Sequence, residues 1–299
     1  MRIVTDLNFG WLYKNDFKPE YIKKGFNAKG FTPVSIPHTN IEIPYNYFDE
    51  EIYAFESCYL RKIKIPADYK GKDIFLCFEG AAHYARVYLN GKLLKEHKGG
   101  YSGFEVKLND AVIYGGENLI AVHLDSRERE EIPPFGNVVD YLTYGGIYRE
   151  VCLRVVDKIH IKDLFVKTIN VLDDIKTIET DIMLSGFESG LDIEITLNDA
   201  EGNTVSSLTQ NGISSAEVKV KHSVSGLELW DIDSPVLYSL SVELKKKGKV
   251  IDKVSQVTGF REAVFKTDGF YLNGKRKDSE NPGIKPSPEL CLYRLRNAG

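Results

Sequence analysis

The chain has 299 residues, a net charge of −4 and 42% hydrophobic residues. This length allows two domains of ordinary size, and the composition is that of a globular protein rather than a disordered one. The absence of a basic excess argues against nucleic acid as a partner, and no apolar run approaches the roughly 20 residues of a membrane span. Because the first eleven residues lack the apolar core of a signal peptide, the sequence predicts a cytoplasmic protein.

Strand patterns dominate the first half of the chain, and helical periodicity is almost absent. Residues 59–65 read as a strand that Pro66 ends, and residues 73–78 form an unbroken apolar run typical of a strand buried on both faces. Residues 86–89 run into Asn90-Gly91, the strongest short-range signal for a β-hairpin. Short strands joined by glycine-rich turns predict an antiparallel β-sandwich.

The second half alternates apolar and polar residues more cleanly. Leu191, Ile193, Ile195 and Leu197 share one face of a predicted strand, which indicates a sheet with one buried and one solvated side. About seven such strands between residues 159 and 265 fit an immunoglobulin-like domain without the internal disulfide. The basic run 245–249 is interpreted as a solvated hairpin tip between two strands.

Cysteines and histidines give no sign of a metal or redox centre. None of the four cysteines lies in a short metal-binding or redox spacing. Three of them, Cys58, Cys77 and Cys152, fall in strand-like runs, where buried reduced thiols are expected. The six histidines are scattered, with no pair at helical ligand spacing. The sequence therefore predicts no metal site and no cofactor.

The long loop 125–144 ends in the stretch that carries the candidate site. Asp140, Tyr141 and Tyr144 precede Gly145-Gly146, and residues 148–156 then read as a strand. A carboxylate accepts hydroxyl hydrogen bonds and aromatic rings stack on the C–H faces of sugars, so this pattern is typical of a carbohydrate site. The alternative interpretation is a structural loop in which the aspartate forms a turn.

Several motifs, in this order, resemble glycoside hydrolase family 2, the β-galactosidase and β-glucuronidase group. The resemblance extends from the N-terminus to about Lys275. Its motifs are Pro37-His38-Thr39, Phe78-Glu79-Gly80, Val87-Tyr88-Leu89-Asn90-Gly91, His97-Lys98-Gly99-Gly100-Tyr101, Gly145-Gly146-Ile147-Tyr148-Arg149, Leu229-Trp230 with Pro235 and Tyr238, Gly259-Phe260-Arg261 and Gly269-Phe270-Tyr271-Leu272-Asn273-Gly274-Lys275.

The resemblance implies an all-β chain with two sandwiches. Residues 1–157 would form a jelly-roll, galactose-binding-like sugar-binding domain and residues 158–265 an immunoglobulin-like β-sandwich. Residues 266–299 would begin the hairpin that enters a (β/α)8 barrel and then continue as an aberrant tail. In this family the barrel carries a glutamic acid and a glutamate that perform retaining hydrolysis, with carboxyl groups roughly 5 Å apart.

A barrel needs about 250 residues, and some 25 follow Gly274. We therefore expect a chain without the catalytic barrel, without a catalytic residue, and inactive alone. Glu280 and Glu289 lie in a proline-rich tail without strand pattern and are not assigned to catalysis. The tail departs from the family's basic-apolar strand, which suggests a frameshift or an artificial end. It predicts irregular packing from about residue 276.

Asp140 stands five residues before Gly145, as an aspartate does in both branches of the family. In the galactosidase branch, this aspartate reaches the barrel's site and helps to bind the sugar and a metal ion. That branch also uses an asparagine where this chain has Ala54, before Cys58-Tyr59. The departure leaves galactosides, glucuronides and mannosides open as substrates.

Three functions follow as hypotheses. The leading one is the non-catalytic N-terminal part of a retaining β-glycosidase, in which the first domain contributes to carbohydrate binding. The second is a stand-alone carbohydrate-binding module that uses Tyr101, Tyr141 and Tyr144. The third is a structural module that forms a homo-oligomer through the apolar face that a barrel would otherwise cover.

Overall fold

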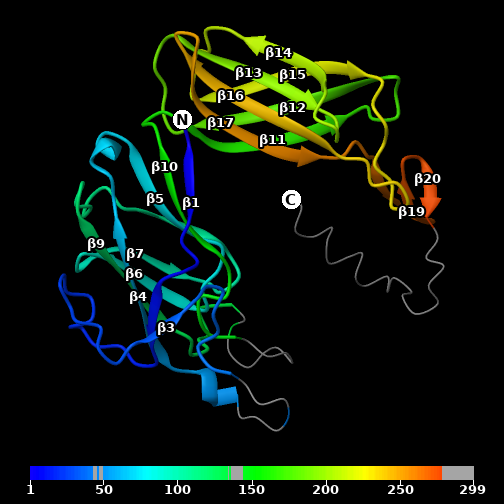
Figure 1. The fold of residues 1–299 in the computed structure, drawn as a ribbon. Coiled ribbons are helices and arrows are strands. Elements are labelled where there is room, and N and C mark those ends of the chain that lie inside the picture. The colour runs from blue at the N-terminus through cyan, green and yellow to red at the C-terminus, as the bar shows by residue number, and fades with distance from the viewer. Residues whose placement is uncertain (43–45, 47–49, 134, 136–143, 278–299) are drawn as a thin grey trace. The chain divides into compact units, whose positions relative to one another are not determined.

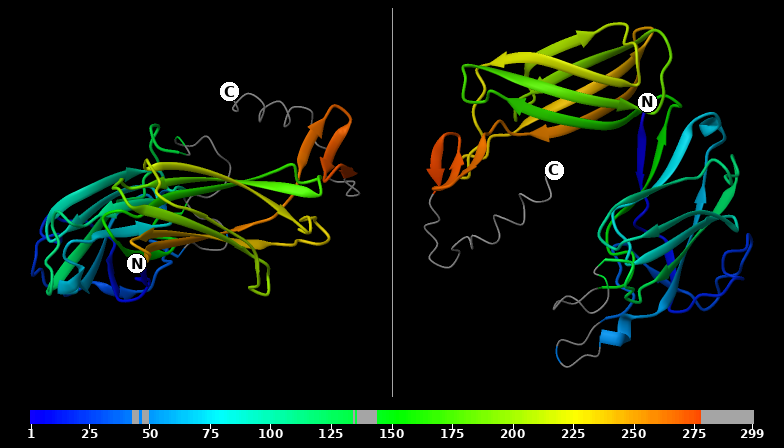
Figure 2. Two further views of the ribbon diagram at one scale, coloured as in Figure 1. Left: turned by 90° about the horizontal axis from the view of Figure 1, so that it is seen from above. Right: turned by 180° about the vertical axis from the view of Figure 1, so that it is seen from behind.

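The computed structural model describes the chain except residues 43–45, 47–49, 134, 136–143 and 278–299. The described chain is built from strands, with two short 3-10 helices at Glu50–Tyr53 and Ala67–Tyr69. It divides into two compact units, Met1–His160 and Ile161–Gly299. Each unit contains two stacked sheets (Figure 1, Figure 2).

The first unit is a jelly-roll sandwich of ten strands. They are β1 (Ile3–Asp6), β2 (Trp11–Lys14), β3 (Thr32–Val34), β4 (Glu56–Lys64), β5 (Asp73–Phe78), β6 (Tyr84–Leu89), β7 (Lys92–Lys98), β8 (Phe104–Lys107), β9 (Glu117–Asp125) and β10 (Val151–Val156). One sheet has the order β1-β10-β5-β8 and the other the order β3-β2-β4-β9-β6-β7, and neighbouring strands in both sheets run antiparallel.

The core of this unit lies between the two sheets. Every second residue of β5 and β10 points into it, for example Leu76 and Leu153. The six-stranded sheet is also covered on its other face, where Tyr21, Phe26 and Phe31 from the β2–β3 connection pack over Leu60 and its neighbours. Strand β9 is therefore buried on both faces.

Two local predictions concern β5 and the hairpin that follows it. The hairpin at Asn90-Gly91 is confirmed: both residues have positive φ, 52° and 87°, as the right-handed twist of β6 and β7 requires. The prediction that residues 73–78 are buried on both faces is wrong, because Phe75 and Cys77 are half-buried on the outer face. The cations of Lys107 and Arg154 lie over the Phe75 ring and shield it partly from water.

The second unit is an immunoglobulin-like sandwich of seven strands followed by a small sheet. Its strands are β11 (Ile161–Ile169), β12 (Ile175–Leu184), β13 (Leu191–Asn198), β14 (Thr204–Gln210), β15 (Glu217–Ser225), β16 (Tyr238–Lys246) and β17 (Lys249–Thr258). The orders are β11-β12-β15 and β14-β13-β16-β17, so the fourth strand joins the larger sheet. The basic run 245–249 forms the tip of the hairpin between β16 and β17, as predicted, with Lys247 and Gly248 in the turn itself.

A three-stranded sheet of β18 (Ala263–Lys266), β19 (Gly269–Leu272) and β20 (Lys275–Lys277) follows the sandwich (Figure 1). We expected irregular packing from about residue 276, which is wrong for Arg276 and Lys277: both belong to β20. The ammonium of Lys277 lies 2.7 Å from the Asp231 carboxylate. The rest of the predicted tail, including Glu280 and Glu289, lies outside the described residues.

Candidate sugar-binding site

The loop end of the first unit is the end at which β4 and β6 begin and β9 finishes. The register places Glu56 and Tyr84 on either side of Asp125, in one row across three strands. The segment 145–147 passes beside this row. The row and this segment fix the starting points of the loops that carry the candidate site.

The Gly145-Gly146 pair is a close-packed segment in which Gly146 forms an isolated β-bridge with Ala82, and it is not a free turn. Its backbone is bonded on both sides: Asn40 N donates to Gly145 O at 3.0 Å, and Ala82 N donates to Gly146 O at 3.0 Å. A Cβ on Gly145 would lie 2.3 Å from Asn40 Nδ2, and one on Gly146 would lie 2.4 Å from His38 O. Gly146 also has φ +114°, a conformation that side chains rarely adopt. Both glycines are therefore required by packing.

The strand after this pair begins later than expected. We predicted a strand from Tyr148, whereas β10 begins at Val151. Tyr148 instead donates its hydroxyl to the Gly100 carbonyl oxygen, which ties the segment to the loop 99–103. This contact holds two loops of the same end together.

Of the three predicted sugar-binding residues, one lies in the described part of the chain. Tyr144 is 55% exposed and directly precedes the buried glycines, so its ring faces solvent from a fixed backbone position. Asp140 and Tyr141 lie outside the described residues, and their role stays a prediction. Ala54, the position that departs from the galactosidase pattern, is half-buried.

Beneath the glycine segment lies a buried network of neutral polar groups. Tyr13 donates its hydroxyl to Asn40 O at 2.7 Å, and Asn40 Nδ2 donates to Tyr53 O at 2.8 Å. The Tyr59 hydroxyl lies 2.8 Å from His38 Nδ1. Burial raises the pKa of Tyr13 to about 12 and lowers the pKa of His38, so both groups are uncharged near neutral pH. The network fixes the segment without placing a charge in the core.

An ion cluster stands at the end of β9. The Asp125 side chain is buried and accepts from Arg127 Nε and Nη2, both at 2.8 Å, and from Arg129 Nη2 at 2.5 Å. Burial alone would raise the pKa of Asp125, but the hydrogen bonds from both arginines outweigh it and lower the pKa to about 2. Arg127 also pairs with Glu56, so the cluster links the first residues of the long loop to β4.

His123 joins this cluster as a neutral ring. Its Nε2 lies 2.9 Å from Glu56 Oε2 and its Nδ1 lies 3.3 Å from Arg86 Nη1. Burial lowers the pKa of His123, and the Phe17 ring stacks on it with centroids 3.6 Å apart. In the neutral tautomer that fits both contacts, Nε2 donates to Glu56 and Nδ1 accepts from Arg86.

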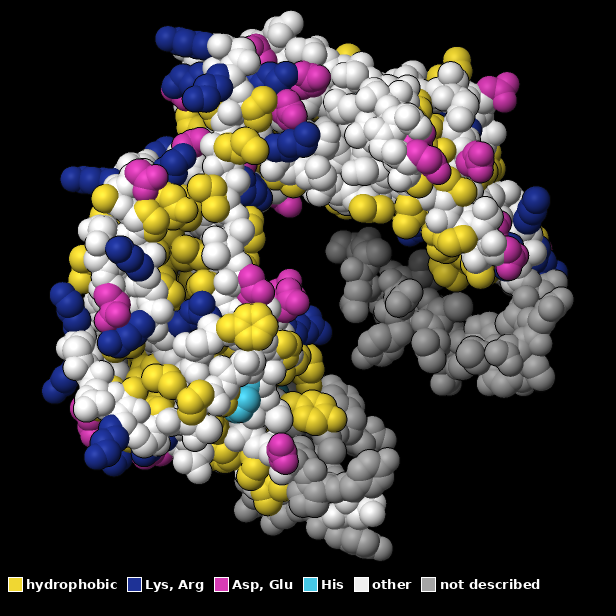
Figure 3. Space-filling view, viewed as in Figure 1, with side chains coloured by type: hydrophobic (Ala, Val, Ile, Leu, Met, Phe, Trp, Pro, Cys, Tyr) yellow, Lys and Arg dark blue, Asp and Glu magenta, His cyan; other side chains and the backbone are white. Residues whose placement is uncertain are grey.

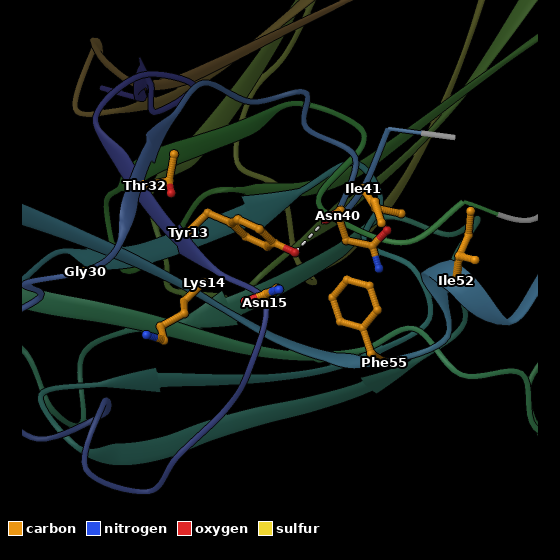
Figure 4. A pocket seen from close by; sticks show the side chains of 9 residues that line it. All are labelled: Tyr13, Lys14, Asn15, Gly30, Thr32, Asn40, Ile41, Ile52 and Phe55. Carbon is orange, nitrogen blue, oxygen red and sulfur yellow. Dashed lines mark hydrogen bonds between the residues drawn. The ribbon is translucent and has the colours of Figure 1, made fainter. Parts of the chain in front are cut away.

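A pocket of about 540 Å³ opens beside the network, within the usual size range of ligand sites (Figure 4). Figure 4 shows the Tyr13 ring and the Asn40 and Phe55 side chains turned toward one another. The pocket is lined by Tyr13, Lys14, Asn15, Gly30, Thr32, Asn40, Ile41, Ile52 and Phe55. Aromatic faces beside amide and hydroxyl groups can hold a sugar-sized polar ligand.

Sequence reasoning missed this pocket and also His83. The pocket is assembled from four separate segments, none of which carries a motif. His83 is 2% exposed, and neither ring nitrogen has a hydrogen-bond partner among the described residues. Burial lowers the pKa of His83, which keeps the ring neutral. The sequence signal was its place in the motif-rich stretch 78–91.

No group of three or more His, Cys, Asp or Glu side chains in the described residues is arranged to hold a metal ion. None of the helices in the described part of the chain has the length and apolarity needed to span a bilayer.

The described chain therefore combines a jelly roll that has a loop-rich end with an immunoglobulin-like sandwich. Residues 19–156 match the family model "Glycosyl hydrolases family 2, sugar binding domain", and residues 159–261 match "Glycosyl hydrolases family 2". The chain belongs to glycosyl hydrolase family 2.

Curated relatives and solved structures agree. A β-galactosidase of Thermoanaerobacterium thermosulfurigenes is 40% identical over 92% of this chain and 39% of its own length. A β-glucuronidase of Bacteroides fragilis is 32% identical over 73% of this chain and 33% of its own length. The crystal structure of a Bacteroides uniformis β-glucuronidase matches with a TM-score of 0.81 and 26% identity, over 92% of this chain and 34% of that one. The chain thus spans under two fifths of the length of these relatives.

Proposed function

We propose that this chain supplies the sugar-binding and immunoglobulin-like domains of a retaining β-glycosidase, and that the loop end of its first unit contributes carbohydrate contacts. The functional divisions are residues 1–157, 158–265 and 266–299, the last of which leads toward a catalytic barrel. The matches to both family 2 models and the relatives named β-galactosidase and β-glucuronidase support this proposal. Catalysis is assigned to the barrel glutamates and to no residue of this chain.

The observation that carries the proposal is that the backbone is held in place where the long loop ends. Hydrogen bonds from Asn40 and Ala82 hold Gly145 and Gly146 on opposite sides. Tyr144 is therefore attached to a rigid backbone and its ring is exposed. An aromatic platform for a sugar requires both features. Asp140 and Tyr141 complete the proposed set, with the Asp140 carboxylate accepting sugar hydroxyl groups.

Calorimetric titration with galactose, glucuronate and mannose tests this site. We expect Tyr144→Ala to weaken binding of the preferred sugar about twofold to tenfold, since aromatic contacts contribute roughly 0.5–1.5 kcal/mol beyond burial. Phe165→Ala is the matched control, because Phe165 is 54% exposed in the other unit.

Two outcomes separate the hypotheses. Heat from the chain with free sugar would favour a stand-alone carbohydrate-binding module. The alternative is that the first unit completes the sugar site of the barrel. Absence of heat, together with a raised KM for Tyr144→Ala in an enzyme that contains this chain and a barrel, would favour this role. An unchanged KM and no heat would refute the site. Turnover of nitrophenyl β-galactoside or β-glucuronide by the pure chain would refute the assignment of catalysis to the barrel.

An apolar surface on the second unit supports a second candidate, self-association. Val257 is 63% exposed and lies opposite Ser239 on the neighbouring strand. Leu237 lies two residues before Ser239 and is 43% exposed, so it shares the face of the sheet on which Val257 lies. Phe265 is 72% exposed in the adjacent small sheet. Figure 3 shows hydrophobic side chains gathered at this end of the unit. A monodisperse monomer in light scattering at high protein concentration would refute this candidate.

The choice between galactoside, glucuronide and mannoside, and the cytoplasmic location, stay predictions.

A further inference from the structure

Two cysteines that are 75 positions apart in the sequence meet on one sheet. Cys77 of β5 and Cys152 of β10 are direct partners in the antiparallel register. Such partners have Cα atoms about 4.5 or 5.5 Å apart, and both separations fall within the roughly 4.4–6.8 Å that disulfides span. Both thiols are free in this structure. The separation of the two Cα atoms therefore permits a disulfide between these strands.

Both cysteine side chains point away from the core. Their neighbours along the strands, among them Leu76 and Val151, are buried in the core, whereas Cys77 and Cys152 are half-buried on the opposite face. Cys152 also lines a surface pocket of about 390 Å³. A small reagent can thus approach its sulfur from solvent.

The pair differs chemically from the third cysteine of the unit. A hydrogen bond from the Cys77 thiol lowers the pKa of Cys152 to about 7, while the same bond raises the pKa of Cys77. Cys152 is then the attacking thiolate and Cys77 the second thiol. Cys58, in contrast, is fully buried, and burial raises its pKa, so its thiol is expected to be inert.

We propose that Cys77 and Cys152 form a redox-active dithiol that closes to a cross-strand disulfide by exchange with a small cationic disulfide. The Cys152 thiolate attacks one sulfur of the reagent, its S–S bond breaks, and one small thiolate leaves. Cys77 then loses its proton to solvent and attacks Cys152 Sγ, which releases the second small thiolate. Two protein thiols become one disulfide, and one disulfide becomes two small thiols, so two electrons are transferred.

The preference for a cation follows from the pocket that leads to Cys152. Its lining includes the carboxylates of Asp6, Glu79 and Glu150 and no basic side chain. Arg154 lies near the thiols but pairs with Glu105 at 2.7 Å, which compensates its charge. The field in the pocket therefore attracts a positive reagent and repels a negative one.

The disulfide would tie together the two ends of the segment 77–152. This segment contains Ala82, Asp125 and the Gly145-Gly146 pair, that is, most of the loop end. Oxidation would constrain the unfolded first unit and raise its melting temperature by roughly 5 °C or more. The loop end would thereby become more resistant to unfolding under oxidising conditions.

The test uses the full chain, reduced and then freed of reductant under argon. Cystamine is expected to remove two of the four thiols, with a Cys77–Cys152 linked peptide in the digest and a mass lower by two hydrogen atoms. The rate should exceed that with the anionic glutathione disulfide by on the order of tenfold at low salt, and the excess should fall at high salt.

Variants sharpen the result. Cys77→Ser should keep cystamine on Cys152 as a stable mixed disulfide, whereas Cys58→Ser should still lose two thiols. A linked peptide that contains Cys58 or Cys291, or a persistent mixed disulfide on the wild-type chain, would overturn the proposal. Equal rates with both reagents at low salt would overturn its preference for cations. The digest of the wild-type chain decides the pairing even if a variant fails to fold.

Discussion

Asp125→Asn is predicted to destabilise the first unit by about 2 kcal/mol at neutral pH. The carboxylate is 2% exposed and accepts hydrogen bonds from Arg127 and Arg129. The folded state lowers its pKa from 3.8 to about 2. Each pKa unit corresponds to about 1.4 kcal/mol, so the shift is equivalent to about 2 kcal/mol. Asparagine keeps the shape of the side chain and loses the charge.

The same shift fixes the pH dependence. Because the folded pKa lies below the unfolded one, the contribution is complete above about pH 5 and is lost as the pH falls toward 2. The difference between wild type and Asp125→Asn should therefore shrink by about 1 kcal/mol between pH 7 and pH 3.

Urea unfolding followed by tryptophan fluorescence measures this difference. Trp11 is fully buried in the first unit, and a Trp230→Phe background makes it the sole tryptophan. Asp110→Asn is the control, because that side chain is exposed and the hydrogen bond from Lys92 goes to its backbone oxygen. A stability of Asp125→Asn within about 0.5 kcal/mol of the control at pH 7, or a pH-independent difference, would refute the reasoning.

Two further substitutions test the packing of the first unit. Gly145→Ala would place a Cβ 2.6 Å from Ser126 Oγ, so we expect a loss of about 1–3 kcal/mol by urea titration, and an unchanged midpoint would contradict the close packing. Asn118 is fully buried, and its amide bonds Ile113 N and Ile113 O. Asn118→Ala leaves these groups unpaired, and calorimetry should show a melting temperature several degrees lower, whereas Asn203→Ala at an exposed turn should change it little.

Local sequence patterns predicted local structure well. The Asn90-Gly91 hairpin and the buried face of Leu191 to Leu197 follow from turn chemistry and from alternation, which involve neighbouring residues only. The order of motifs also predicted a jelly roll followed by an immunoglobulin-like sandwich, and the structure confirms this fold class. These features are fixed by a few adjacent residues and need no knowledge of the partner strands.

Features that depend on strand register escaped prediction. Cys77 meets Cys152, and Glu56 meets Asp125, because distant strands pair at one particular offset. The burial of β9 on both faces was not expected either, since it depends on the aromatic cover from the β2–β3 connection. In the candidate site, Tyr144 is exposed and its role in sugar binding stays a prediction. The support beneath it, built by Asn40 and Ala82, has no sequence signature.

The pairing of β1 with β10 brings the two ends of the first unit next to each other. Ile3 lies opposite Val155, and the Met1 amino group lies 2.9 Å from the Asp157 carboxylate. The polypeptide thus enters and leaves the jelly roll at the same edge. A fold with adjacent ends can be transplanted, duplicated or inserted into another protein without rerouting the chain. Joining residues 1 and 157 by a short linker and opening the hairpin at Gly91 should give a circular permutant that keeps the same sheets.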